Sequence, residues 1–213
     1  MRTRAAFPGF GKGKPSPSKG KTFPPEILTP DEVLAILEAC GGTLLGARNR
    51  ALLTVLYRSG LRCAEALALR PKDIDLAVGS IAVLHGKGDR SRIVGIDPGA
   101  APIITTWMER REAELAPPPG TALFCSRRCK PMTKSSVREL LIRLASSAGI
   151  TKRVHPHGLR HTMAYELLME GLPVPIIQRQ LGHTSLATTD RYLDHIAPIE
   201  VIEFIQTREW TPR

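Results

Sequence analysis

The apolar residues of this chain repeat with a helical period along most of its length and with a strand period in one short stretch. The first helical segment opens on a capping box formed by Thr29 and Glu32. Two β-prone runs, residues 81–85 and 92–96, flank a glycine-containing segment at 86–89 that is typical of a hairpin tip. The pattern therefore predicts a mainly α fold with a small antiparallel β-sheet, an α+β class.

Glycine, proline and capping residues set the expected helix limits. The first helix begins near Pro30, and a first strand of the small sheet is expected to start at Ile74. A capping box from Ser136 to Glu139 indicates the start of one later helix. The remaining helices are predicted at about residues 48–59, 62–69, 101–114, 136–148, 157–170, 174–181, 185–195 and 198–206.

The N-terminal 25 residues differ in composition from the rest. They contain 11 Gly, Pro or Ser residues, six basic residues and no acidic ones. This composition predicts a flexible basic arm or linker over residues 1–25, followed by a single folded domain over residues 26–213. The arm lysines are Lys12, Lys14, Lys19 and Lys21.

Composition restricts the class of protein. The chain has no apolar run near the ~20 residues that a membrane span needs, and no signal peptide, so we expect no membrane partner and a cytoplasmic location. Its net charge of +10 favours a polyanionic partner, with nucleic acid first. The four cysteines lack a zinc-site or disulfide spacing and are expected to be reduced thiols.

A histidine–arginine cluster is the first candidate for chemistry. His157, Arg160 and His161 lie three and four positions apart, so on a helix they can share one face. A guanidinium holds two phosphate oxygens, and an imidazole can move a proton near neutral pH. The alternatives are a solvated helix face and a metal site with His155, and the absence of nearby acidic or Cys ligands disfavours metal.

Two upstream residues form a second candidate. Arg62 follows a glycine turn at the start of a helix, and Glu65 lies one turn further on. Such a pair is most often a surface ion pair of little energetic value, but Glu65 could also orient Arg62 toward a ligand. Lys87, between two glycines at the hairpin tip, is either a solvated lysine or a side chain that reaches into a groove.

The third candidate lies near the C-terminus. Gly182 ends a predicted helix, so His183 is expected on a turn and Tyr192 on the helix that follows. A single Tyr on a helix is usually a core residue. The polar flanks of Tyr192, Asp190 and Asp194 among them, favour a position near the surface instead.

In this order and spacing the motifs resemble the tyrosine recombinase (phage integrase) family, which includes the Xer-type recombinases and phage integrases. The resemblance covers about residues 26–205 and rests on four motifs: Gly60-Leu61-Arg62-x-x-Glu65, His85-Gly86-Lys87-Gly88, His157-x-x-Arg160-His161-Thr162 and Leu181-Gly182-His183-x-Ser185-x-x-Thr188-Thr189-x-x-Tyr192. It implies a tyrosine recombinase catalytic-domain fold and a site-specific recombinase or integrase that cleaves and rejoins DNA.

The resemblance also implies a role for each site residue. Arg62 and Arg160 would hold the non-bridging oxygens of the scissile phosphate, and His183 would donate a hydrogen bond to it. Lys87 would protonate the leaving 5′ oxygen, His157 would help to move the Tyr192 proton, and Glu65 would support the site. Tyr192 would form a 3′-phosphotyrosyl bond that conserves the ester energy, so no metal, nucleotide or other cofactor is expected.

Elementary chemistry agrees with these roles. Negative charge that gathers on a phosphodiester under attack is stabilised by about 3–4 kcal/mol for each well-placed donor. A tyrosine hydroxyl, with an ordinary pKa near ~10, is a poor nucleophile at pH 7 unless cationic neighbours and a base assist it.

The expected partner is double-stranded DNA. Additional contacts to DNA are expected from Arg90, Arg92 and His161, and from the arm lysines. The apolar C-terminal segment is expected either to fold back on its own domain or to pack on a neighbouring subunit, as in a homo-tetramer on DNA, and the location would then be nucleoid-associated.

The sequence alone leaves alternative functions open. Within the same chemistry, the chain could be a transposase or resolvase, or a nicking-closing enzyme similar to type IB topoisomerases. In another class, it could be a non-catalytic DNA-binding module. Family members usually carry a helical core-binding domain before the catalytic part, so this chain is either a fragment or a minimal recombinase.

Overall fold

A computed structural model describes residues 26–84 and 91–182 of the chain. Within these ranges the protein is mainly helical and has one three-stranded antiparallel sheet, as the sequence predicts. The helices expected at 185–195 and 198–206, the hairpin tip and the N-terminal arm lie outside the described residues.

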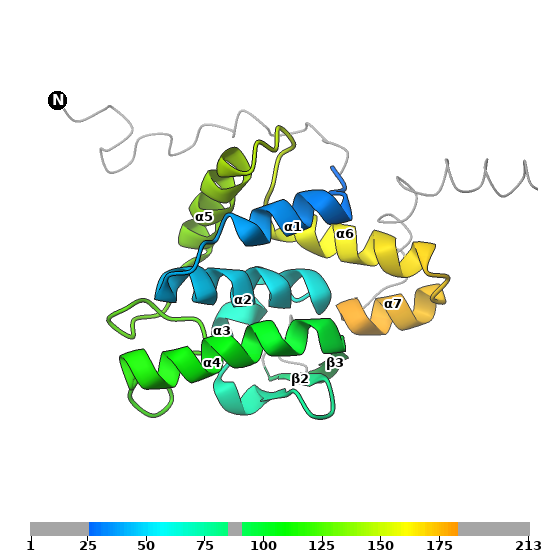
Figure 1. The fold of residues 1–213 in the computed structure, drawn as a ribbon. Helices are drawn as coiled ribbons and strands as arrows, with labels where there is room; N and C mark the ends of the chain where they lie inside the picture. Colours follow the sequence, from blue (N-terminus) through cyan, green and yellow to red (C-terminus); the bar gives the residue numbers. More distant parts are fainter. Residues whose placement is uncertain (1–25, 85–90, 183–213) are drawn as a thin grey trace, which may run out of the picture.

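The helix α2 (Leu44–Arg58) forms the centre of the fold. In Figure 1 it runs through the middle of the molecule, with α1 (Pro30–Glu38) and α6 (Pro156–Met169) on one side and α4 (Ala101–Leu115) on the other. Every residue of α2 from Ala51 to Tyr57 is buried. A helix segment that is covered on all sides has no face exposed to water, which explains why residues 51–57 of α2 are almost all apolar.

The first helix confirms its predicted cap. The Thr29 hydroxyl accepts a hydrogen bond from the Glu32 N–H at 3.2 Å, and the Glu32 carboxylate accepts one from the Thr29 N–H at 2.7 Å. The same carboxylate pairs with the Lys152 ammonium group at 2.7 Å. The Leu28 N–H donates to the Thr162 hydroxyl on α6, so the start of the domain is fastened to a helix more than a hundred residues away in the chain.

The sheet has the order β1 (Ile74–Asp75), β2 (Ser80–Val83), β3 (Arg92–Gly95). Ile81 lies opposite Val94, and Val83 lies opposite Arg92. Side chains alternate between the two faces, so Ile81, Val83 and Val94 enter the core while Ile93 remains 75% exposed. The antiparallel pairing of β2 with β3 confirms the two predicted strands, and the tip between them lies outside the described residues.

Short elements position the ends of the sheet. The helix α3 (Cys63–Ala68) leads into the 3-10 turn η2 (Pro71–Asp73), and η3 (Pro98–Ala100) joins β3 to α4. The helix α7 (Val174–Leu181) closes the described part of the chain beside β3.

Three helix starts differ from the sequence prediction, each because a different residue caps the helix. Thr43 accepts the Gly46 N–H, so α2 begins four residues earlier than expected. Thr133 and Ser136 form the cap of α5 (Lys134–Ser147), in place of the predicted box from Ser136 to Glu139. His155 caps α6 through its ring nitrogen, which moves that start to Pro156.

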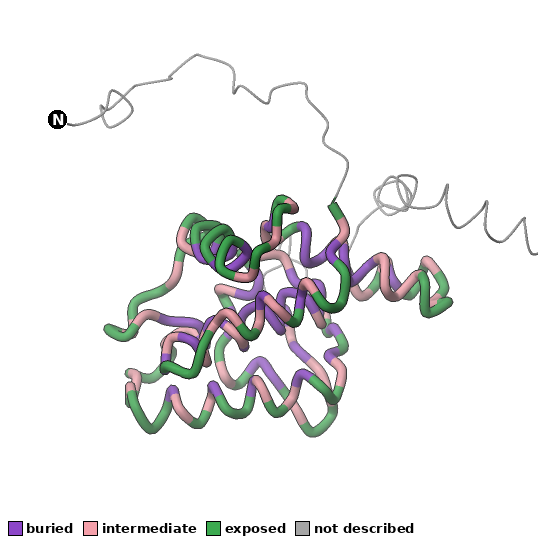
Figure 2. The backbone as a smooth tube through the Cα atoms, turned by 45° about the horizontal axis from the view of Figure 1, so that its top comes forward, coloured by how far each residue is buried: buried purple, intermediate pink, exposed green. Residues whose placement is uncertain are grey.

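Burial is concentrated where the helices face one another. The backbone coloured by burial has its buried residues in the interior and its exposed residues on the outer turns and connections (Figure 2). Trp107 and Phe124 are both enclosed, and the Trp107 indole N–H donates to the Leu123 carbonyl at 3.1 Å. Among the described residues no helix is both long enough and apolar enough to cross a bilayer.

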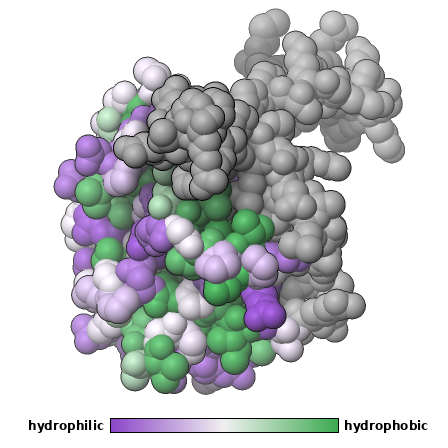
Figure 3. Space-filling model, turned by 90° about the vertical axis from the view of Figure 1, so that its right-hand side faces the viewer, coloured by the Kyte–Doolittle hydropathy of each residue, from purple (hydrophilic) through white to green (hydrophobic). Residues whose placement is uncertain are grey.

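The end of the molecule at α6 and α7 has a mixed surface. Apolar and polar side chains lie side by side on this face (Figure 3). Met169 on α6 is 50% exposed and Ile176 on α7 is 49% exposed.

Candidate active site

The loop before α3 is shaped by close packing against two helices. Gly60 has a φ of +63°, and a Cβ atom there would lie 2.6 Å from the Met163 sulfur and 2.9 Å from a Leu181 methyl group. A side chain at this position would meet both a backbone penalty and a steric clash. Gly60 thus lets the chain turn tightly against α6 and α7 and enter α3 at Arg62.

Arg62 and Glu65 are joined by more than a surface ion pair. The Arg62 N–H donates to Glu65 Oε2 at 2.8 Å, and its Nη1 donates to Oε1 at 2.9 Å. The Glu65 side chain is only 4% exposed, whereas that of Arg62 is 31% exposed. The Glu65 carboxylate is therefore buried and fixed in place, and Arg62 is the member of the pair that faces solvent.

A second arginine holds the same carboxylate. Arg92 on β3 donates from Nη1 to Glu65 Oε1 at 3.0 Å and from Nη2 to Oε2 at 2.8 Å, a bidentate pair. Burial raises the pKa of Glu65, but the hydrogen bonds from Arg92 and from the backbone and side chain of Arg62 outweigh it and lower the pKa to about 2. Glu65 is consequently ionised at any pH near neutral.

Arg160 is enclosed where α6 passes the end of α7. Its side chain is 1% exposed. Its Nη1 donates to the Gly60 carbonyl, and its Nη2 donates to the Leu181 carbonyl at 2.6 Å. A buried guanidinium bonded to backbone on both sides fixes the relative position of the two loops that precede α3 and follow α7.

The turn at Gly182 lies against two of these arginines. Arg62 Nη2 donates to the Gly182 carbonyl at 3.1 Å. Gly182 has a φ of +64°, and a Cβ atom there would lie 2.4 Å from Arg92 Nε. Arg62, which caps α3, and Arg92 of β3 therefore both contact the turn at Gly182. Arg160 binds the carbonyl of the preceding residue, Leu181.

The histidines of α6 lie beside this cluster. The rings of His157 and His161 meet edge to face with centroids 4.5 Å apart. His157 is an exposed residue, but the protein around its imidazole, together with the charges of Arg160, His155 and Arg62, lowers its pKa to about 4. A neutral imidazole at pH 7 is able to accept a proton.

The structure brings Arg62, Glu65, Arg160, His157 and His161 into one region, as the sequence motifs require. Several other predicted residues lie outside the described residues: Lys87, His183, Tyr192, Arg90, Lys12, Lys14, Lys19 and Lys21. Their placement stays a prediction.

Arg92 has a buried acidic partner that the sequence did not predict. In the structure both of its terminal nitrogens bind the Glu65 carboxylate and its side chain is 16% exposed, while the DNA contact expected of it stays a prediction. A charged residue on a strand gives no sequence signal for this role, because its acidic partner is 27 residues away on a helix.

Gln180 was not expected to be part of the site. Its side-chain oxygen accepts the Gly95 N–H at 2.9 Å, and its amide nitrogen donates to the Gly95 and Ser59 carbonyls at 2.7 and 3.1 Å. The side chain thus continues the hydrogen bonding of β3 and attaches the strand to α7. No sequence motif marks it.

A metal was disfavoured by the donor set in the sequence. Over residues 26–84 and 91–182, no three His, Cys, Asp or Glu side chains gather in a way that could hold a metal ion. One ring nitrogen of His155, Nδ1, accepts the Gly158 N–H at 3.0 Å.

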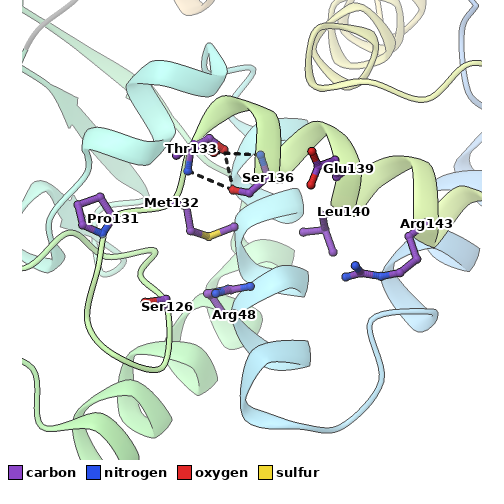
Figure 4. Close-up of a pocket in the computed structure, with 9 residues that line it drawn as sticks. All are labelled: Arg48, Ser126, Pro131, Met132, Thr133, Ser136, Glu139, Leu140 and Arg143. Atoms are coloured by element: carbon purple, nitrogen blue, oxygen red, sulfur yellow. Dashed lines mark hydrogen bonds between the residues drawn. The ribbon is translucent and has the colours of Figure 1, made fainter. Parts of the chain in front are cut away.

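A separate hollow of about 370 Å³ lies between the first half of α2, the start of α5 and the loop at 126–131. In Figure 4 the Thr133–Ser136 cap forms part of its rim. Arg48, which lines it, donates to the Cys125 carbonyl at 3.0 Å and to the Asn49 side chain. None of the predicted site residues lines this hollow, so it is distinct from the arginine cluster.

The sequence profile of the Phage integrase family matches residues 26–197. The chain belongs to this family, and the resemblance found in the sequence motifs is confirmed. Its fold is that of a tyrosine recombinase catalytic domain, as shown by a 30% identical crystal structure, that of XerA recombinase.

Named relatives are recombinases of the Xer type. The chain is 38% identical over 195 residues to tyrosine recombinase XerD of Bifidobacterium longum (strain NCC 2705), covering 87% of this chain and 63% of the relative. It is 39% identical over 185 residues to XerD of Mycobacterium tuberculosis (strain ATCC 25618 / H37Rv), covering 84% of this chain and 58% of the relative. The chain thus spans about three fifths of the length of these relatives.

Solved structures agree in fold. The XerA recombinase structure superposes with a TM-score of 0.77, covering 89% of this chain and 68% of that one. The XerH site-specific recombinase bound to palindromic difH substrate, in a post-cleavage complex, superposes with a TM-score of 0.73 at 29% identity, covering 87% of this chain and 54% of that one.

Proposed function

We propose that this chain carries the catalytic part of a site-specific DNA recombinase that cleaves and rejoins DNA through a phosphotyrosyl bond at Tyr192. The observation that supports the proposal is the meeting of Arg62 and Arg160 at the Leu181–Gly182 turn, directly before His183. Arginine forks suit the paired oxygens of a phosphodiester. Family membership and the Xer-type relatives favour the same activity.

The arginines stabilise the charge of the transition state. Arg62, the partly exposed member of the cluster, binds a non-bridging oxygen of the scissile phosphate, and Glu65 keeps its guanidinium in orientation. Arg160 binds the second oxygen, which requires its enclosed guanidinium to be uncovered when DNA binds. His183 donates a third hydrogen bond to the phosphate.

Proton transfer completes the reaction. The Tyr192 oxygen attacks phosphorus as its proton passes to neutral His157, and the bond from phosphorus to the 5′ oxygen breaks. Lys87 gives its proton to the departing 5′ oxygen. A 5′-hydroxyl from a second strand then attacks the phosphotyrosyl ester, which restores a phosphodiester and the tyrosine, so no nucleotide is consumed.

The partner in this proposal is double-stranded DNA, bound by a homo-tetramer that the C-terminal segment holds together, in the cytoplasm and associated with the nucleoid. Arg90, His161 and the basic residues of the 1–25 arm add phosphate contacts. Deletion of residues 1–25 is expected to weaken DNA binding and to reduce the slope of log affinity against log salt by about one for each lost phosphate contact. An unchanged slope would remove the arm from the binding surface.

The decisive test is formation of a covalent adduct. Duplexes selected for binding to the protein are prepared with a single nick that is moved one nucleotide at a time, so that a short strand diffuses away after cleavage. Wild-type protein is expected to form a protein–DNA band on a denaturing gel, and Tyr192→Phe is expected to form none. Binding to the selected DNA without an adduct at any nick position would favour the non-catalytic DNA-binding module.

Strand exchange separates the remaining alternatives. A recombinase exchanges strands between two duplexes that carry the site. Relaxation of supercoiled plasmid without such exchange would instead indicate a nicking-closing enzyme similar to type IB topoisomerases.

A further inference from the structure

We propose that Arg92 is a positioning residue for strand cleavage, which holds the Arg62 guanidinium through Glu65 and supports the Gly182 turn that leads to His183. The proposal rests on the proposed function and replaces the DNA contact that was expected of Arg92. It assigns to a strand of the hairpin a direct part in the geometry of the arginine cluster.

Arg92 forms a bidentate ion pair with Glu65. Its two terminal nitrogens bind the two oxygens of the carboxylate at 3.0 and 2.8 Å. The side chains are 16% and 4% exposed, so water competes little for either group. Both edges of the carboxylate are fixed by this fork, which a single ammonium group could not do.

Glu65 transmits this position to Arg62. The oxygen that accepts Arg92 Nη1 also accepts Arg62 Nη1 at 2.9 Å, and the oxygen that accepts Arg92 Nη2 also accepts the Arg62 N–H at 2.8 Å. Both the side chain and the backbone of Arg62 are therefore hydrogen-bonded to a carboxylate whose position Arg92 fixes. Without Arg92, a buried carboxylate would keep only the Arg62 side of its pairing.

Arg92 also forms the surface under the Gly182 turn. Its Nε, Cζ and Cδ atoms all lie within 2.8 Å of where a Cβ atom would stand on Gly182. The Nε atom is buried and has no hydrogen-bond partner among the described residues, which is consistent with packing against the glycine backbone. Arg62 binds the carbonyl of the same glycine, so the turn lies between the two arginines.

The strand that carries Arg92 is itself fastened to α7. Gln180 binds both backbone groups of Gly95 and the Ser59 carbonyl. The end of β3 at Gly95 is thus attached to α7, and Arg92 at its start packs against Gly182, which follows α7. Hydrogen bonds and packing thus connect β3, Glu65, Arg62 and the 181–182 turn, so a displacement of one is expected to displace the others.

Three variants of the full chain test the proposal. Arg92→Ala removes the fork, Arg92→Lys keeps the charge without the fork, and Arg110→Ala is the matched control. Arg110, on α4, pairs with Glu114 at 2.7 Å and donates to the Gly42 carbonyl at 3.0 Å, and it has no contact with Glu65, Arg62 or Arg92 among the described residues. DNA affinity and the rate of adduct formation at saturating DNA are measured separately on the nicked duplex.

A positioning role and a phosphate contact give opposite results. We expect Arg92→Ala to lower the saturating rate by about 100-fold, the usual cost of a small misplacement of a catalytic group, with affinity and salt slope unchanged. Arg92→Lys should recover part of the rate, and Arg110→Ala should match wild type. A salt slope smaller by about one with an unchanged saturating rate would overturn the proposal and return Arg92 to the DNA contacts.

A substrate without phosphate charge distinguishes positioning from general damage. In a methylphosphonate at the scissile position, one non-bridging oxygen is replaced by a methyl group, so stabilisation by Arg62 matters less. If Arg92 acts through Arg62, the defects of Arg92→Ala and Arg62→Ala should both shrink to within about 10-fold of wild type on this substrate. An Arg92→Ala defect that is equal on both substrates would contradict the proposal.

Amide hydrogen exchange gives a readout that needs no DNA. The Arg62 N–H should exchange at least about 10-fold faster in Arg92→Ala than in wild type, and unchanged protection would overturn the proposal. If wild-type protein forms no adduct on any DNA, the proposed function fails. If wild type reacts and Arg92→Ala reacts equally fast, the positioning role alone fails.

Discussion

The Nη2 atom of Arg160 donates a hydrogen bond to the Leu181 carbonyl oxygen at 2.6 Å, across the junction of α6 and α7. The residue that the family pattern assigns to phosphate binding is therefore also a structural element of this junction. Its side chain is as buried as the apolar core, at 1% exposure. Effects on stability and on catalysis are expected to appear together at this position.

Replacing Arg160 by Ala should reduce the free energy of unfolding by about 3 kcal/mol. The change leaves the Gly60 and Leu181 carbonyls without their donor in a buried environment, at about 1–3 kcal/mol each, and opens a cavity. Urea unfolding followed by circular dichroism measures the loss. The control is Arg110→Ala, which loses a part-exposed ion pair and one bond to the Gly42 carbonyl, and an Arg160→Ala protein as stable as that control would contradict the predicted loss.

Gly182→Ala should destabilise the protein by more than Gly171→Ala. Both glycines have a positive φ, +64° and +81°, so both pay the backbone strain of about 1–3 kcal/mol. Only at Gly182 would the added methyl group meet the Arg92 guanidinium, whereas a Cβ atom at Gly171 meets nothing within 4 Å. The difference in thermal midpoint between the two variants isolates the contact with Arg92, and equal midpoints would argue against it.

The Glu65 carboxylate should make the stability of the protein depend on pH in the acid range. Its folded pKa of about 2 lies below the ordinary value of 4.5, so its contribution is fully present above pH 4.5 and is lost as the pH falls toward 2. The shift corresponds to about 3 kcal/mol. Glu65→Gln should be less stable than wild type at pH 6, and the two unfolding free energies should converge as the pH falls. Parallel curves would contradict the assignment.

His157 should remain neutral well below the ordinary range of histidine. Its pKa of about 4 means that the imidazole gains its proton only as the pH falls past 5, and stability linked to the neutral form is lost as the pH falls from about 6.5 toward 4. An NMR titration of the imidazole C–H signals, assigned with His157→Gln, measures the midpoint. A midpoint at or above 6.5 would remove the physical basis for His157 as the base in the DNA-free protein.

Gln180→Leu should weaken the attachment of β3 to α7 and leave the hydrogen bonds of Arg62, Arg92 and Arg160 intact. The variant loses three hydrogen bonds to backbone groups of Gly95 and Ser59, which predicts a loss of about 1–3 kcal/mol in unfolding free energy. Faster amide exchange at Gly95 would locate the effect. Arg179→Leu, a change at the neighbouring position with no such bonds among the described residues, is the comparison, and an equal loss in both would leave Gln180 without a special role.

Local chemistry in the sequence predicted most of the described elements and the residues of the candidate site. The Thr29–Glu32 cap, the strand alternation around Ile81 and the glycine after Leu181 act over a few residues, so their signals can be read directly. The spacing of His157 and His161 likewise predicted that they share a face, and their rings are in contact. The predicted start at Ser136 was wrong because Thr133, Ser135 and Ser136 compete to cap the helix, and the structure selects Thr133. The starts at Leu44 and Pro156 were missed although Thr43 and His155 cap them.

What only the tertiary structure decided is the state of each charge. Nothing in the sequence distinguishes Arg62, which is 31% exposed, from Arg160, which is 1% exposed, or from Arg92, which is paired with Glu65. The free energy of an ionised group depends on the water and the charges around it, and those come from segments 20 to 120 residues apart. The sequence by itself determined the helical fold, the family and the set of candidate residues, while the packing of β3 and α7 around Glu65 decided which arginine faces solvent and which ones hold it in place.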